Sequence, residues 1–217
     1  MMFRHLICSL MLTFTAMAFA QEDTTEKFNI EAFNQNRKNG GEWRRTLPDN
    51  TKIRVWYNPK GYYHQETTPF RSAYTYKKVF NTKGSLVSEG QSFYSFSVDI
   101  SRQYDDQGKL VKEKNNNENF SFSVEDLAAK MLADYKIDIL NSDNIYTLSR
   151  GQNIDPPLSS YQVYFYDLSS PAPDQAVIAV LVEGNTGEVL HTLETYTKKP
   201  TPVLEAYLQK VANTPAK

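Results

Sequence analysis

The chain has 217 residues with 24 basic and 25 acidic side chains, so its formal net charge is −1. A balance this close to neutral favours neither nucleic acid nor an anionic membrane surface as a partner. The single cysteine, Cys8, lies within the first twenty residues.

Those first twenty residues have the pattern of a secretory signal peptide, expected over 1–20. Arg4 and His5 precede a mostly apolar stretch over 6–14, and Ala18-Phe19-Ala20 forms an A-x-A cleavage signal. Cleavage after Ala20 would leave 197 residues without cysteine, in an oxidising compartment but without disulfides. We therefore expect a periplasmic or secreted protein. No later segment is long and apolar enough to span a bilayer.

Residues 21–42 are expected to form a leader with one short helix. Asn29 can cap a helix over 30–37, which Asn39-Gly40-Gly41 would end. A turn at 48–50 then precedes a strand over 52–57, in which apolar and polar side chains alternate.

A phrase of about ten residues recurs three times over 43–122, beginning at Tyr57, Phe80 and Tyr104. Each copy has an aromatic residue, Asn or Asp, two polar residues, Gly, an extended stretch and Glu. The Asn or Asp and the Gly fit the first and fourth positions of a turn that ends in a left-handed residue. Further strands are expected over 74–80, 85–95, 97–104 and 109–114, which predicts an antiparallel meander of hairpins.

A second unit is expected over 123–213, after a polar break at 115–119. Ser123 and Asp126 are typical of a helix start, and apolar residues then follow at helical spacing to Tyr135. Strands are expected over 145–149, 161–168, 176–183 and 188–194, with a tight hairpin at 184–187 and a final amphipathic helix after Thr201-Pro202. The fold class predicted is α+β: an N-terminal antiparallel β-hairpin repeat sheet followed by a small helix-on-antiparallel-sheet module.

The three phrases resemble the variant MORN-type repeat of exported bacterial proteins, some of which are antitoxin or immunity components. The shared pattern is aromatic-Asn/Asp-x-x-Gly-x-Leu-x-x-Glu, clearest over 80–89 and 104–113. The first copy departs from it, with Tyr63 in place of Leu86 and Leu110. This resemblance implies a repeated hairpin sheet and leaves the partner open.

The second half is similar to PepSY-type domains in the helix over 123–135, the strand over 161–165 and the closing phrase over 180–190. That resemblance implies a small α+β module of exported proteins, often linked to peptidase inhibition. The loops over 150–160 and 168–175 are longer than is usual for the family, which leaves convergence on a helix-plus-hairpin unit as the alternative.

No catalytic, cofactor or metal site is predicted. The only histidines after the signal peptide, His64 and His191, lie in separate predicted strands without a second ligand at metal-binding spacing. The cysteine-free mature chain has no thiol for catalysis or zinc. Asp105-Asp106 lies in a hairpin turn, where Asp is favoured for backbone hydrogen bonds. A hydrolase whose site leaves no pattern in the sequence is kept as a third possibility.

Six residues are candidates for contact with a protein partner: Glu66, Glu89, Glu113, Tyr74, Tyr76 and Tyr94. The Glu recurs once per hairpin, so the three carboxylates would form an acidic row for a basic partner if the hairpins stack in register. The alternative is cross-strand pairing with Lys77, Lys78 or Arg102. For the Tyr residues the alternatives are an exposed binding patch and packing in the core.

These patterns predict an exported, non-enzymatic protein-binding or inhibitory protein of the bacterial envelope, such as an immunity protein against a periplasmic toxin. The alternative is a PepSY-type module that inhibits a peptidase or assists the cell-wall machinery. In either case the expected partner is a protein (a toxin, a peptidase or another envelope enzyme), and no cofactor is expected.

Overall fold

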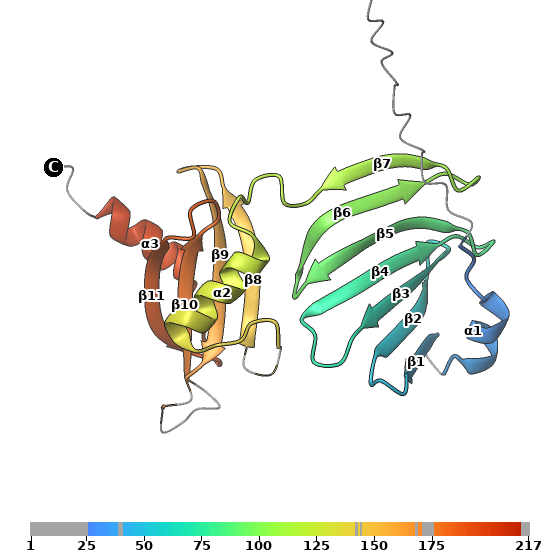
Figure 1. Cartoon of the computed structure of the whole chain (residues 1–217), viewed down its shortest axis with the longest axis horizontal. Coiled ribbons are helices and arrows are strands. Elements are labelled where there is room, and N and C mark those ends of the chain that lie inside the picture. The colour runs from blue at the N-terminus through green and yellow to red at the C-terminus, as the bar shows by residue number, and fades with distance from the viewer. Residues whose placement is uncertain are drawn as a thin grey trace, which may run out of the picture.

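The computed structural model describes residues 26–38, 41–141, 143, 145–167, 169–170 and 176–213. They form two antiparallel sheets and three α-helices (Figure 1), which confirms the predicted α+β class. The predicted signal peptide lies outside the described residues. Within the described part of the chain, no helix has the length and apolar character needed to cross a membrane.

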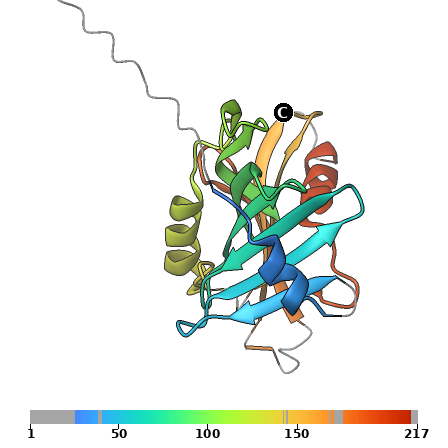
Figure 2. The ribbon, with the colours of Figure 1, turned by 90° about the vertical axis from the view of Figure 1, so that its right-hand side faces the viewer.

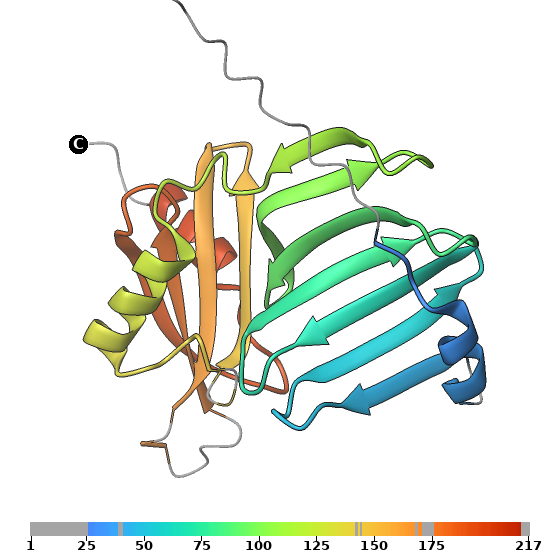
Figure 3. The same ribbon diagram turned by 45° about the vertical axis from the view of Figure 1, so that its right-hand side comes forward.

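The larger sheet is a meander of seven strands that lie side by side in chain order, each antiparallel to the next (Figure 3). The strands are β1 (Glu42–Thr46), β2 (Lys52–Asn58), β3 (Tyr62–Thr68), β4 (Tyr74–Phe80), β5 (Leu86–Phe93), β6 (Phe96–Tyr104) and β7 (Leu110–Asn115). The predicted hairpin sheet is therefore confirmed. The sequence predicts no strand range for β1 or β3, although the first repeat phrase includes an extended stretch where β3 begins.

The three repeat phrases form the turns that the sequence predicts. In each turn the Gly N–H donates to the carbonyl oxygen of the Asn or Asp three residues earlier, at 2.9–3.0 Å. Gly61, Gly84 and Gly108 have φ of 90°, 75° and 84°, a conformation that a side chain would strain. The side-chain oxygens of Asn81 and Asp105 each accept two further backbone N–H groups, so these polar residues hold the turn from inside.

The aromatic residues of the repeat form a stripe across one face of the sheet. Tyr57 pairs with Tyr63, Tyr63 with Phe80, Phe80 with Leu86, and Tyr104 with Leu110. Phe28 from the N-terminal segment stacks on the rings of Tyr63 and Phe80, with centroids 4.9 and 5.2 Å away. Phe80, Leu86 and Tyr104 are buried in one cluster with Phe28 packed against it, whereas Tyr57 of the first hairpin is 41% exposed.

Helix α1 (Ile30–Asn36) covers the β1–β3 end of the same face (Figure 2). Asn29 caps it as predicted, with its side-chain oxygen accepting the Ala32 N–H at 2.8 Å. Phe33, which is fully buried, packs against Ile53 and Val55 of β2. This anchors the leader to the sheet.

The smaller sheet has the strand order β11-β10-β9-β8, with a helix on each face (Figures 1 and 2). Its strands are β8 (Ile145–Asn153), β9 (Leu158–Tyr166), β10 (Ala176–Glu183) and β11 (Val189–Tyr196), and its helices are α2 (Val124–Tyr135) and α3 (Val203–Ala212). The predicted cap of α2 is confirmed, because the Ser123 hydroxyl accepts the Asp126 N–H and Asp126 accepts the Ser123 N–H. Two covered faces explain why β10 is apolar along nearly its whole length.

The two sheets share one hydrophobic core. Phe93 and Val98, at the end of the β5–β6 hairpin, belong to the same buried cluster as Leu127 and Met131 of α2 and Tyr161 of β9. The predicted domains, 43–122 and 123–213, therefore meet across packed side chains.

Arg150 of β8 reinforces this junction. Its guanidinium donates to the carbonyl oxygens of Ser97 and Asn116, and lies over the rings of Phe96 and Phe120 at 4.7 and 4.6 Å from their centroids. These contacts tie the start of β6, the linker and β8 together.

Candidate functional site: the uncovered face of the larger sheet

The two faces of the seven-stranded sheet have different surroundings. The aromatic stripe, α1 and the shared core all lie on one face, which we call the covered face. Among the described residues, no helix packs on the opposite face, which we call the uncovered face. Side chains alternate between the two along each strand.

Cross-strand pairing builds a row of side chains over the middle of the uncovered face. Arg44 pairs with Arg54, Arg54 with Glu66, Glu66 with Lys77, Lys77 with Gly90, and Ser101 with Lys114. Gly90 and Ser101 join the two parts, because a Cβ on Gly90 would lie 2.9 Å from the Ser101 Oγ. This central row (Arg44, Arg54, Glu66, Lys77, Gly90, Ser101 and Lys114) runs across all seven strands.

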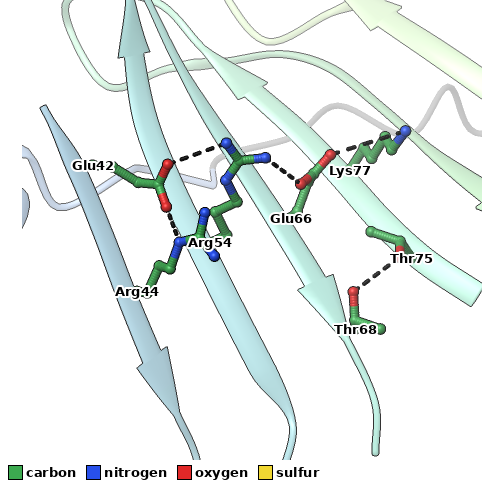
Figure 4. Close-up of polar contacts among 7 residues, drawn as sticks. All are labelled: Glu42, Arg44, Arg54, Glu66, Thr68, Thr75 and Lys77. Carbon is green, nitrogen blue, oxygen red and sulfur yellow. Dashed lines mark hydrogen bonds and ion pairs between the residues drawn. The ribbon is translucent and has the colours of Figure 1, made fainter. Parts of the chain in front are cut away.

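Ion pairs connect the β1–β4 part of the central row (Figure 4). Glu42, also on β1, accepts from the Arg44 Nε and from the Arg54 Nη2, the latter at 3.1 Å. Glu66 lies 3.6 Å from the Arg54 Nη1 and 4.0 Å from the Lys77 Nζ. Hydrogen bonds from Arg44 and Arg54 lower the pKa of Glu42 to about 2, so at neutral pH this carboxylate accepts hydrogen bonds and does not donate a proton.

An aromatic pair adjoins this network. The rings of Trp56 and His64, cross-strand partners on β2 and β3, stack with centroids 5.0 Å apart and planes 9° from parallel. The Arg54 guanidinium lies over the Trp56 ring at 4.6 Å from its centroid. The side-chain nitrogen of Asn58 lies 2.8 Å from the His64 Nε2. Stacking and hydrogen bonding within the chain therefore fix the orientation of these rings in the unbound protein.

We expect the stability of the protein to depend on pH through His64. Burial lowers the pKa of His64, so the folded state favours the neutral ring. The resulting stability is complete above the unfolded-state pKa of about 6.5 and is lost as pH falls through the lower folded-state pKa. Urea unfolding of the wild type and of His64→Phe, between pH 8 and 5, tests this. The decrease below pH 6.5 should be smaller in the variant, and an equal decrease would contradict the expectation.

The uncovered face carries an excess of positive charge. Pairing places six cationic strand residues on it but only two strand carboxylates, Glu42 and Glu66. Two further carboxylates, Asp105 and Asp106 of the β6–β7 turn, line a hollow at its edge. Asp99, in the β6 bulge, accepts a hydrogen bond from the Asn117 side chain. The six cations are Arg44, Lys52, Arg54, Lys77, Lys112 and Lys114. This face is therefore basic on a chain whose net charge is −1.

The three repeated Glu residues do not form one row. Glu66 lies on the uncovered face, whereas Glu89 and Glu113 lie on the covered face with Arg102 between them, at 4.0 and 3.1 Å. The pairing register shifts beside the turns of the second and third hairpins but not of the first. One extra residue in a strand turns every later side chain to the other face. The alternative of cross-strand ion pairing is confirmed.

The three Tyr candidates also differ. Tyr74 donates to Glu125 of α2 at 2.8 Å, and Tyr94 donates to the Ile139 carbonyl oxygen at 2.9 Å, so both support the junction between the sheets. Burial raises the pKa of both hydroxyls. Tyr76, on the covered face, is 49% exposed. Contact with a partner stays a prediction for all six candidate residues.

Sequence reasoning missed Glu42, Arg44 and the Trp56–His64 stack. The available signal is the alternation of side chains over 52–57, which sets Arg54 and Trp56 on the same face of that strand. In the described part of the chain, no group of three or more His, Cys, Asp or Glu residues is placed to hold a metal ion.

No protein-family model matches the chain, and no curated protein matches it.

Proposed function

We propose that this is an exported, non-catalytic binding protein that contacts a protein partner through the uncovered face of its seven-stranded sheet. The observation that carries the proposal is the contrast between the two faces. Helices and the N-terminal segment pack on one face, while the other presents side chains that ion pairs and stacking hold in place. Seven strands about 4.8 Å apart span about 29 Å, which is wide enough for a protein partner.

Two open hollows on this face would accept side chains of the partner. One, of about 260 Å³, is lined by Arg54, Glu66 and Thr68. The other, of about 430 Å³, is lined by His64, Val79 and Gln103, with Asp105 and Asp106 at its β6–β7 turn end. Partner side chains in such hollows dominate the binding energy of many protein interfaces.

The signal-peptide pattern and the MORN-type resemblance favour an immunity or inhibitory role in the bacterial envelope, in which the sheet covers a toxin. The PepSY-type resemblance supports the alternative, inhibition of a peptidase or assistance to a cell-wall enzyme. The identity of the captured partner separates the two roles.

The test compares the wild type with Arg54→Ala/Lys77→Ala as baits for a bacterial envelope extract. Any protein captured by the wild type is purified and its binding measured by calorimetry. We expect the double variant to bind at least about tenfold more weakly, because it removes two central cations of the face.

Lys198→Ala/Lys199→Ala is the matched control, since it removes the same charge from an exposed turn outside the larger sheet. It should bind like the wild type. The proposal fails if no captured protein binds after purification, or if the two double variants bind alike.

A further inference from the structure

We infer that the partner of the uncovered face presents an acidic protein surface, an inference that rests on the proposed function. The sequence pattern predicts the opposite, a basic partner for an acidic row. The structure does not contain that acidic row, because the register shifts turn Glu89 and Glu113 to the covered face. What remains on the uncovered face is the excess of cations.

Several of these cations have little internal compensation. Among the described residues, Lys77 has only Glu66 as an ion-pair partner, at 4.0 Å, and its other cross-strand neighbour is Gly90, which has no side chain. Lys112 and Lys114 pair across the strand with Gln103 and Ser101, and neither forms an ion pair with a described residue. Lysines on an edge strand such as β7 also discourage edge-to-edge aggregation, but β4 is an interior strand. Edge protection therefore does not account for Lys77.

The arrangement favours a protein over a uniform polyanion. Glu42 and Glu66 lie among the cations and would repel a nucleic acid or an anionic membrane at those points. A protein surface with an acidic excess can place a donor opposite each Glu and carboxylates opposite Lys77 and Lys114. The Trp56–His64 stack adds a flat aromatic surface beside the charges, as in protein interfaces.

The test uses a fluorescent acidic peptide of about 20 residues, in which Glu alternates with Ser and Tyr, and a matched peptide with Gln in place of every Glu. We expect the full chain to bind the Glu peptide at least about tenfold more tightly at about 50 mM salt, and the preference to shrink at about 300 mM. Lys77→Glu/Lys114→Glu should abolish the preference. Lys198→Glu/Lys199→Glu, with the same charge change elsewhere, should keep it.

Equal binding of the two peptides would overturn the inference. So would tighter binding of phosphatidylglycerol vesicles or of a DNA duplex than of the Glu peptide, because the face would then serve a polyanion. Failure of the proposed function is distinguishable. An envelope extract that yields no partner, with the peptide preference intact, counts against that function alone. If a purified partner binds this face with an affinity that does not change with salt concentration, the result counts against an acidic partner surface but not against the proposed function.

Discussion

Replacing Gly187 with Ala is expected to lower the free energy of unfolding by about 2–4 kcal/mol. Gly187 has φ of 74°, and an added Cβ would lie 2.3 Å from the Phe122 ring. The ring of Phe122 is half-buried against the shared core, and hydrogen bonds fix its backbone. The Phe122 N–H donates to the Gly184 carbonyl oxygen, and its own carbonyl oxygen accepts the Tyr161 hydroxyl at 2.7 Å. The cost therefore combines backbone strain with overpacking.

Gly41→Ala is the matched control. Gly41 has nearly the same φ, 77°, but an added Cβ would meet no atom within 4 Å. It should therefore cost only the backbone strain, about 1 kcal/mol. Urea unfolding of both variants measures the difference. Equal losses would show that Phe122 moves aside, contrary to the packing described for it.

Local chemistry made much of the fold predictable. The Asn or Asp and Gly of each repeat turn, the Ser123–Asp126 cap and the 184–187 hairpin are all short-range patterns, and each is present as expected. These short-range patterns do not predict which residues far apart in the sequence contact one another. Phe120 and Phe122, beside the polar break at 115–119, pack against Gly184 and Gly187 some sixty residues later. Nothing in the local sequence distinguishes such anchors from ordinary linker residues.

The candidate site was less predictable, for a reason that the Glu residues illustrate. All three occupy the same place in the repeat, yet a single extra residue in the pairing decides which face each one occupies. The sequence repeats the turn but does not state the register beside it. Which face stays uncovered is likewise decided elsewhere, by where α1 and Phe28 pack.

Replacing Phe93 with Ala is expected to cost about 3–5 kcal/mol and to weaken both sheets at once. Phe93 is fully buried on β5, yet its cluster includes Leu127 of α2 and Tyr161 of β9. The cavity would therefore open between the two sheets. Trp43 and Trp56 both lie in the larger sheet, so their fluorescence follows it, while circular dichroism at 222 nm mainly follows α2 and α3. We expect both signals to shift to lower urea by similar amounts.

Phe80→Ala is the control that distinguishes separate unfolding of the two sheets from unfolding as one unit. Phe80 is equally buried on the neighbouring strand β4, but its cluster contains only residues of the larger sheet and Phe28 of the N-terminal segment. If the sheets unfold separately, Phe80→Ala should shift the fluorescence alone, whereas Phe93→Ala still shifts both signals. If they unfold as one unit, both variants shift both signals. A Phe93→Ala protein whose helical signal keeps its wild-type midpoint would contradict the shared core, because deleting that ring would then leave the smaller sheet unaffected.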